Sequence, residues 1–331
     1  MVRCIRVPKA EGNPIRLALK AEDLLDVGAR IKADGNDLLI PILSDSFKDY
    51  PVEDADLEIL EHKETDYRMF LPADIRDILP NSYDCIGDVI VVKIIDELLP
   101  YKNAIGDALL KVNSNVRLVL MDGGVKGELR IRELEPIAGT GTSETRHRES
   151  GVTMLTDPGR VYFNPRLATE RMRVASEVKD GEVIIDMFAG VAPFPMVIAK
   201  HAKPEIIYSI DLNHDAYLYM IENIRINKVK NVVPLEGDAT VVVKDLPLAD
   251  RVVMNLPQIA YQFLDVALSK AKKGGVVHLH RIMERATCDA EMESLLDEMR
   301  SKGLDCHMGK KYEMKTYSPT ASVYVFDIIR D

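Results

Sequence analysis

The chain has 331 residues, a length that fits two or three domains. Hydrophobic residues make up 47% and charged residues 29%, which suits ordinary packed cores and excludes a disordered or low-complexity chain. No apolar run approaches the roughly 18 residues of a membrane span, and the N-terminus lacks the apolar segment of a signal peptide, so we expect a soluble, cytoplasmic protein without a membrane partner.

Charge is unevenly spread along the chain. The net charge is −10, from 43 basic and 53 acidic residues, and by itself this argues against a nucleic-acid partner. Residues 159–174, however, hold four arginines (Arg160, Arg166, Arg171 and Arg173) against one acid, Glu170. This cluster can be read only together with the motifs around it.

The four cysteines, Cys4, Cys85, Cys288 and Cys306, lie far apart and form no CxxC pair. The histidines are not clustered either. Zinc sites and disulfide frameworks need close spacing, so we expect reduced thiols and no metal site.

Residues 1–66 predict a small α/β domain. Its elements are a strand at 4–8, a helix at 13–25 and a strand at 37–42. The acidic stretch 45–64 follows, and its composition favours a mobile or weakly packed joint.

Residues 67–158 predict a second small α/β domain. The expected elements are a helical stretch at 75–79, a strand at 88–94, a helix at 102–112, and strands at 116–121 and 129–134.

Residues 159–331 predict a larger domain in which strands and helices alternate. The expected strands are 183–188, 206–211, 232–238, 251–255, 274–280, 306–314 and 322–329, and the expected helices are 193–202, 214–227, 258–271 and 288–303. Such alternation is typical of a doubly wound, mostly parallel sheet of the Rossmann-like type. The fold class is therefore α/β, with this domain preceded by two smaller ones.

Polar residues follow four of these strands, where ligands bind in such sheets. The first strand leads into Asp186-Met-Phe-Ala-Gly190, the second ends in Asp211, the third in Gly237-Asp238-Ala239 and the fourth in Asn255-Leu-Pro257. A tight glycine turn at a helix N-terminus admits a ligand close to the backbone. A nicotinamide nucleotide is a weaker alternative, because the usual G-x-G-x-x-G is absent after the first strand.

The chain resembles the archaeal and eukaryotic tRNA (guanine-N1)-methyltransferases that act at position 37. The resemblance rests on Asp186-Met-Phe-Ala-Gly-Val-Ala-Pro-Phe, Asp211-Leu-Asn and Asn255-Leu-Pro, and extends over essentially the whole chain through segments 83–89, 126–135, 161–171 and 315–319. It implies methyl transfer from S-adenosylmethionine to N1 of guanosine 37 of tRNA. One departure is Ala192, where the family usually has glycine; a methyl group there could loosen the contact with the cofactor.

The implied chemistry needs three things. N1 of guanine carries a proton, so an enzyme must remove it, hold the charge that spreads to O6, and orient the base. The resemblance implies Glu170 as the base, Arg130 as the charge-stabilising group and Asn255 as the residue that orients guanine. On the residue pattern alone, the alternative for Glu170 is an exposed helix residue paired with Arg166 or Arg173. For Arg130 the pattern alone favours a strand-surface ion pair.

The resemblance also implies the binding residues. The cofactor would be held by Arg171, Asp186, Phe188, Gly190, Asp211, Leu212, Asp238, Ala239, Asn255 and Pro257. Within this set Arg171 would lie near the methionine carboxylate, Asp211 at the ribose and Leu212 at the adenine. The tRNA would be held by Lys126, Arg130, Arg146, Arg148, Arg160, Arg166, Lys310, Lys311 and Lys315, and Tyr162 is either an aromatic wall or core. Residues 1–66 would check the outer corner of the tRNA, and we expect a monomer.

Other functions stay open at this point. An enzyme of wyosine synthesis could transfer the aminocarboxypropyl group of the same cofactor, or a second methylation could act on a tricyclic wyosine precursor. A non-catalytic tRNA-binding protein and a nicotinamide-dependent oxidoreductase are more remote.

Overall fold

The computed structural model describes residues 1–59, 66–127 and 131–331, and the side chain of Lys126 is not described. Contacts divide the chain into two compact units, Met1–Asp66 and Tyr67–Asp331. None of the helices in the described ranges has the length and apolar character needed to cross a membrane.

The first unit is a four-stranded antiparallel sheet with one helix. The order is β2-β3-β1-β4, with β1 at Val2–Pro8, β2 at Lys32–Asp34, β3 at Asp37–Pro41 and β4 at Val52–Ala55. Helix α1, Gly12–Ala21, packs Ile15 and Leu19 into the core of this unit. It ends four residues earlier than expected, because Asp23 adopts a left-handed conformation with φ of 55°.

The acidic stretch is largely part of this unit, so the expectation of a mobile joint over 45–64 is wrong for its first half. Phe47 is buried in the core, and β4 pairs with β1. The guanidinium of Arg6 lies 2.8 Å from the carboxylate of Glu53, so basic residues on β1 offset the acidic composition of β4. Residues 60–65 lie outside the described residues.

The second unit begins with a small four-stranded sheet and its covering helix. Its order is β5-β6-β7-β8, with β5 at Asp84–Ile86, β6 at Val89–Val92, β7 at Leu118–Lys126 and β8 at Ile131–Gly139. Helix α2 spans Lys102–Val112 as predicted, and the expected helical stretch near 75 is a 3-10 helix, Ala73–Ile78. A hairpin of β9, Thr145–Glu149, and β10, Val152–Thr156, follows.

The larger sheet confirms the predicted mostly parallel α/β fold. Its order is β13-β12-β11-β14-β15-β17-β16, and all pairs from β13 to β15 are parallel, whereas β17 is antiparallel to both of its neighbours. The strands are β11 Val183–Asp186, β12 Ile206–Asp211, β13 Val232–Glu236, β14 Ala249–Met254, β15 Ala271–Glu284, β16 Cys306–Thr316 and β17 Ala321–Arg330.

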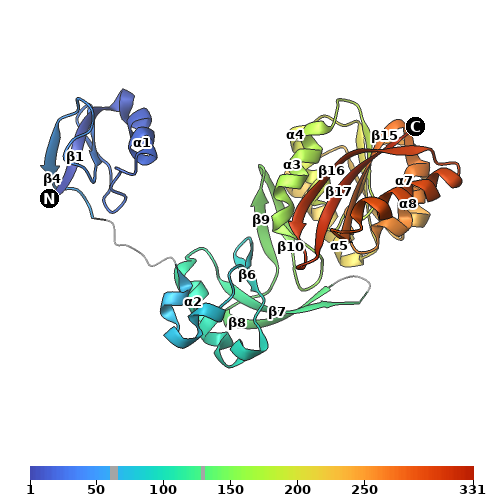
Figure 1. Ribbon diagram of the computed structural model, residues 1–331, viewed down its shortest axis with the longest axis horizontal. Helices are drawn as coiled ribbons and strands as arrows, with labels where there is room; N and C mark the ends of the chain where they lie inside the picture. Colours follow the sequence, from blue (N-terminus) through green and yellow to red (C-terminus); the bar gives the residue numbers. More distant parts are fainter. Residues whose placement is uncertain (60–65, 128–130) are drawn as a thin grey trace. The chain divides into compact units, whose positions relative to one another are not determined.

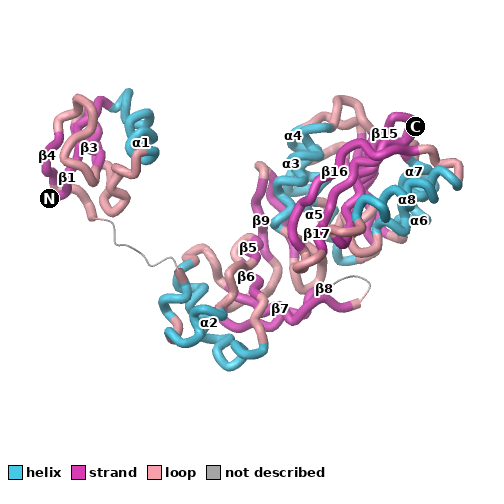
Figure 2. Tube along the Cα trace, viewed as in Figure 1, coloured by secondary structure: helices cyan, strands magenta, loops and turns pink. Residues whose placement is uncertain are grey.

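Helices pack on both faces of this sheet (Figures 1 and 2). One face carries α3 Ala168–Glu177, α4 Pro193–His201 and α5 His214–Asn227, and the other carries α6 Ala239–Val242, α7 Leu264–Lys270 and α8 Cys288–Ser301. The first face shares its hydrophobic core with the small sheet, through residues such as Val89 and Leu120. The contacts therefore leave the second unit undivided, and the boundary expected at 158/159 stays a prediction.

The strand order places the site. Strand β11 lies between β12 and β14, so the chain leaves it first in one direction along the sheet and later in the other. A crevice forms at the carboxyl ends of strands at such a reversal.

Candidate functional site

A cavity of about 380 Å³ lies at this crevice. Residues from the ends of β11, β12, β13 and β14 line it: Tyr162, Met187, Phe188, Gly190, Asp211, Leu212, Asn213, Ala216, Gly237, Asp238, Ala239, Asn255, Leu256, Ile259 and Phe263. Seven of the ten expected cofactor residues are among them, so four strand ends that are distant in the chain meet here. We call this space the cofactor cavity.

The turn after β11 is fastened to the end of β12. The backbone N–H of Gly190 donates to Oδ2 of Asp211 over 2.7 Å, and the N–H of Asn213 donates to Oδ1 over 2.9 Å. Gly190 has φ of 56°, and a side chain there would approach the carbonyl of Tyr162. Burial raises the pKa of Asp211 even though these N–H groups favour its ionised form.

Asp186 lies behind the cofactor cavity instead of lining it. Its side chain is 1% exposed, and Oδ2 has no hydrogen-bond partner in the described part of the chain. Burial, with a further contribution from the charge of Asp211, outweighs the N–H of Phe188 and raises the pKa of Asp186 to about 8. The carboxyl group is thus largely protonated at neutral pH.

The donors and surfaces of the cofactor cavity fit S-adenosylmethionine. Asp211 offers a carboxylate at the end of the second strand, where a ribose diol binds in such folds. Leu212, 56% exposed, presents apolar surface beside Phe188 and Phe263, which suits a flat adenine ring. The glycine turn leaves the backbone open to close approach.

Two expected cofactor residues lie elsewhere. The guanidinium of Arg171 is 1% exposed and is held by Glu149, over 2.5 and 2.6 Å, and by the carbonyl of Asn164. Its contacts fix α3 to β9, so in this structure it is not directed to the cofactor cavity. Pro257 lines the neighbouring cavity.

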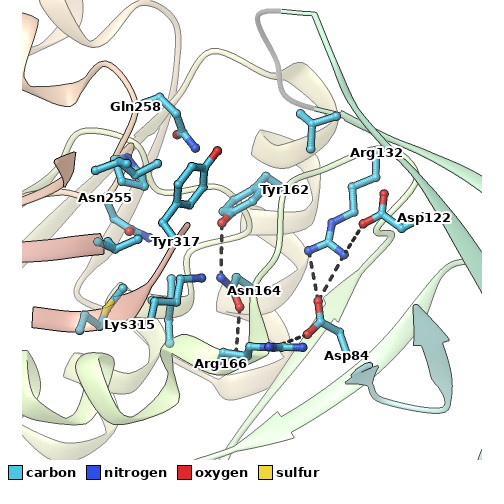
Figure 3. A pocket seen from close by; sticks show the side chains of 16 residues that line it. Asp84, Asp122, Arg132, Tyr162, Asn164, Arg166, Asn255, Gln258, Lys315 and Tyr317 are labelled. Carbon is cyan, nitrogen blue, oxygen red and sulfur yellow. Dashed lines mark hydrogen bonds and ion pairs between the residues drawn. The ribbon is translucent and has the colours of Figure 1, made fainter. Parts of the chain in front are cut away.

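A second cavity, of about 240 Å³, is drawn in Figure 3. Tyr162 and Asn255 line both. The other lining residues are Asp84, Asp122, Val125, Arg132, Asn164, Arg166, Leu167, Pro257, Gln258, Ile282, Met314, Lys315, Tyr317 and Val323. We call this space the acceptor cavity, and Tyr162 is therefore a wall of both cavities and not a core residue.

Charged residues of the acceptor cavity are linked across the second unit. Asp84 on β5 accepts from Nε of Arg166 over 2.6 Å and from Arg132 on β8 over 3.3 Å, and Arg132 also reaches Asp122 at 3.3 Å (Figure 3). The residue pattern did not single out Asp84, Asp122 or Arg132. Asp84 and Arg132 fall within the segments 83–89 and 126–135, whereas Asp122 lies four positions before the second of these.

Glu170 lies outside both cavities. It is 4% exposed, its two oxygens each accept from Arg173 over 2.9 Å, and the phenol of Tyr312 donates to it. Nε2 of His280 lies 3.4 Å away. Burial opposes ionisation, but the nearby imidazole of His280 and the hydrogen bonds from Arg173 and Tyr312 outweigh it and lower the pKa to about 2. The pairing with Arg173 matches the alternative interpretation of Glu170 as a helix residue paired with an arginine, although the Glu170 side chain is buried and not exposed.

The same ionic cluster continues away from Glu170. Arg173 also binds Glu177 and Asp327 over 3.0 Å each, and Asp327 lies 2.6 Å from Nδ1 of His278. The side chains of Glu177, His278 and Asp327 are close enough to hold a metal ion. The guanidinium of Arg173 already occupies that position as the counter-charge.

The expected tRNA-binding residues are dispersed. Arg166 and Lys315 line the acceptor cavity. Arg146 and Arg148 are exposed on β9, Arg160 pairs with Asp215 over 2.5 Å, Lys310 with Glu177 over 2.9 Å and Lys311 with Asp289 over 2.5 Å. Arg130 and the side chain of Lys126 lie outside the described residues.

Ala192 occupies a strained position. It is the N-cap of α4, with φ of 65° and ψ of 43°, and is fully buried. Because it does not line the cofactor cavity, its methyl group cannot loosen the cofactor contact directly.

Family models match three segments of the chain. Residues 145–307 match the TRM5/TYW2 methyltransferase domain, residues 68–142 the TYW2 N-terminal domain, and residues 4–50 the tRNA methyltransferase 5 N-terminal domain. The chain is 43% identical to the tRNA (guanine(37)-N(1))-methyltransferase Trm5b of Pyrococcus abyssi, over 85% of this chain and 84% of that protein. The chain belongs to the Trm5 family of tRNA methyltransferases.

Solved structures agree with this assignment. The crystal structure of Trm5b from Pyrococcus abyssi is similar to this structure, with a TM-score of 0.76 at 38% sequence identity over 99% of both chains. A complex of aTrm5 with tRNALeu matches with a TM-score of 0.72 at 30% identity, again over 99% of both chains. The Trm5 family resemblance read from the sequence is thereby confirmed, and the nicotinamide-dependent alternative is excluded.

The wyosine-pathway alternative is less well supported. The tRNA(Phe) (4-demethylwyosine(37)-C(7)) aminocarboxypropyltransferase of Pyrococcus horikoshii is 30% identical, over 78% of this chain and 92% of that protein. Both the identity and the covered share of this chain are lower than for Trm5b.

Proposed function

We propose that this Trm5 family member transfers a methyl group from S-adenosylmethionine to N1 of guanosine 37 of tRNA. The observation that carries the proposal is the junction of the two cavities at Tyr162 and Asn255. A cofactor in one cavity and a base in the other would meet at these two residues. When bound, the cofactor supplies a sulfonium methyl: the N1–CH₃ bond forms as the S–CH₃ bond breaks, and the N1 proton goes to a base.

The residues of the cofactor cavity would hold and orient the methyl donor. Asp211 would bind the ribose hydroxyls, Leu212 would pack on the adenine, and Asp238 with Ala239 would bind its edge. Cofactor orientation is decisive, because turning the same molecule would present the aminocarboxypropyl carbon instead of the methyl group.

The acceptor cavity would take the guanine. Asn255 can hydrogen-bond to a polar edge of the base, and Tyr162 offers an aromatic surface on which it can stack. The target base has to leave its neighbours to enter the cavity, which costs least in a single-stranded loop.

Glu170 is our proposed proton acceptor in the tRNA-bound state. In the described arrangement its carboxylate is bound by Arg173 and Tyr312, so it must exchange these contacts before it can reach N1. Arg130 is proposed to stabilise the charge at O6. We further propose that the enzyme is a cytoplasmic monomer without a metal ion, and that Met1–Asp66 contacts the tRNA away from the anticodon.

The direct test uses unmodified tRNA with guanosine 37 and a cofactor labelled in its methyl group. The expected product after digestion is labelled 1-methylguanosine, and a tRNA with adenosine 37 should stay unlabelled. A parallel reaction with the label in the methionine carboxylate separates the alternative, because label retained on the tRNA would show aminocarboxypropyl transfer and overturn the proposal.

A further inference from the structure

Lys315 differs from the other charged residues of the acceptor cavity in having no counter-charge. Asp84 and Asp122 pair with Arg132 and Arg166. The ammonium of Lys315 makes no hydrogen bond or ion pair within the described ranges. The two carboxylates, the two guanidinium groups and the Lys315 ammonium together carry a net charge of +1. Lys315 supplies the positive charge that has no partner.

A β-bulge directs this residue into the cavity. Strand β16 pairs Glu313 with Tyr324 and Lys315 with Val323, so Met314 is an extra residue opposite β17. In a regular strand consecutive side chains point to opposite faces, yet Met314 and Lys315 both line the acceptor cavity. Bulges of this kind re-aim side chains next to active sites. Figure 3 shows Lys315 directed toward the space between Tyr317 and Asn164.

The surroundings of the ammonium favour an incoming negative charge. The Lys315 side chain is exposed at the mouth of the cavity. Partial desolvation by its neighbours and then the positive charge of Arg166 lower its pKa; Arg132 acts in the same direction and Asp84 opposes them. A cation that is repelled by its neighbours and has no partner gains most from an anionic ligand.

The proposed assignment of guanine to this cavity decides between anionic ligands. Asp84 and Asp122 are neutralised by Arg132 and Arg166, so a backbone phosphate is the competing ligand that the experiment below separates from guanine. Guanine enters neutral, with N–H donors that suit carboxylates and with O6 as an acceptor, and its O6 becomes anionic only during the reaction.

We propose that Lys315 is a catalytic residue that donates a hydrogen bond to O6 of the target guanine and stabilises the negative charge left when the N1 proton departs. This inference rests on the proposed assignment of guanine to the acceptor cavity. It adds a charge-stabilising group on β16 to the one proposed at Arg130.

The test measures single-turnover methyl transfer and tRNA affinity for Lys315→Ala, Lys315→Arg and a control, Lys302→Ala. Lys302 lies beyond the end of α8 and pairs with Glu298 over 2.8 Å, so its replacement removes one exposed charge that lines neither cavity. We expect Lys315→Ala to lower the rate constant at saturating tRNA by about 10²–10³-fold. Its tRNA Kd should stay within about threefold of wild type, whereas Lys302→Ala should match wild type in both.

The opposite pattern would overturn the proposal. A phosphate contact would leave the saturated rate constant unchanged, raise Kd and reduce the slope of log Kd against log salt by about one. If wild type and Lys302→Ala also make no 1-methylguanosine, the proposed function itself fails.

The pH dependence distinguishes catalysis from a structural role. The wild-type rate should fall at alkaline pH as Lys315 loses its proton, and Lys315→Arg should move this loss to higher pH because a guanidinium stays charged. A high-pH limb that is the same in both proteins would contradict the role. Calorimetric cofactor affinity and thermal unfolding, both unchanged in Lys315→Ala, should show that the variant is folded.

Discussion

Tyr312 on β16 donates a hydrogen bond to the carboxylate of Glu170 on α3, 142 positions away in the chain. Residues close to both ends of this hydrogen bond in the chain line the acceptor cavity. They are Asn164 and Leu167, which precede α3, and Met314 within β16. One buried carboxylate therefore joins two walls of the cavity. Glu170 therefore has two proposed roles: it holds α3 to β16, and it accepts the N1 proton after leaving this contact. Its replacement affects both.

Glu170→Gln should abolish most methyl transfer, by about 10²–10⁴-fold, because the amide cannot accept the N1 proton. Tyr312→Phe is the matched variant: it removes the contact to β16 but keeps the carboxylate. We expect it to lower the single-turnover rate less than about tenfold, with cofactor affinity unchanged in both. Equal losses in the two variants would mean that Glu170 acts only by holding the cavity walls, and Asp84 and Asp122 would then be the next proton acceptors to replace.

Asp186→Asn should change how stability depends on pH. The pKa of Asp186 is raised to about 8, so between about pH 4 and 8 the folded protein holds a proton that the unfolded chain has released. This group therefore makes wild type less stable as pH rises through that window, and asparagine removes the effect. In urea unfolding at pH 5 and pH 8, the stability difference between variant and wild type should favour the variant by about 3–4 kcal/mol more at pH 8. A difference that does not change with pH would show that Asp186 is ionised throughout.

Much of the larger domain could be predicted because its strands and helices follow from residue patterns within short stretches of the sequence. Alternating strands and helices define a parallel sheet, and the carboxyl ends of its strands must meet at one edge. Asp211, Asp238 and Asn255 could therefore be placed together from sequence order alone, and the structure does bring them to one cavity.

The acceptor cavity could not be predicted in the same way, because its walls come from contacts between distant elements. Asp84 and Lys315 are 231 positions apart in the printed sequence and line the same space. Arg171 shows the converse: its place beside Glu170 in the sequence suggested a ligand, but burial against Glu149 determines its contacts. The acidic stretch near Glu53 was misjudged because composition does not reveal the arginines on the neighbouring strand.

Asp211→Ala should weaken cofactor binding without unfolding the protein. It removes the proposed partner of the ribose hydroxyls and also the acceptor of the Gly190 and Asn213 N–H groups, which hold the turn after β11 to the end of β12. We expect the calorimetric Kd for S-adenosylmethionine to rise about 10–100-fold, given about 1.5–3 kcal/mol for a hydrogen bond to a charged group. Asp245→Ala, which changes an exposed carboxylate after α6, is the control and should bind like wild type. Wild-type affinity in Asp211→Ala would exclude this carboxylate from the cofactor site.

Ala192 allows a prediction about the departure from the family pattern. Its left-handed conformation costs about 1–2 kcal/mol, which glycine would relieve. Glycine would also lose about 0.8 kcal/mol of methyl burial and about 0.4–1 kcal/mol through the freer unfolded chain. These contributions nearly cancel, so Ala192→Gly should leave the free energy of unfolding within about 1 kcal/mol of wild type.

Ala199→Gly, inside α4, is the control and should lose about 1 kcal/mol of unfolding free energy, since no strain is relieved there. Ala192→Val should lose more than about 2 kcal/mol, because a β-branched side chain tolerates this conformation poorly. If urea unfolding ranks Ala192→Gly below Ala199→Gly, the strain at Ala192 is not significant.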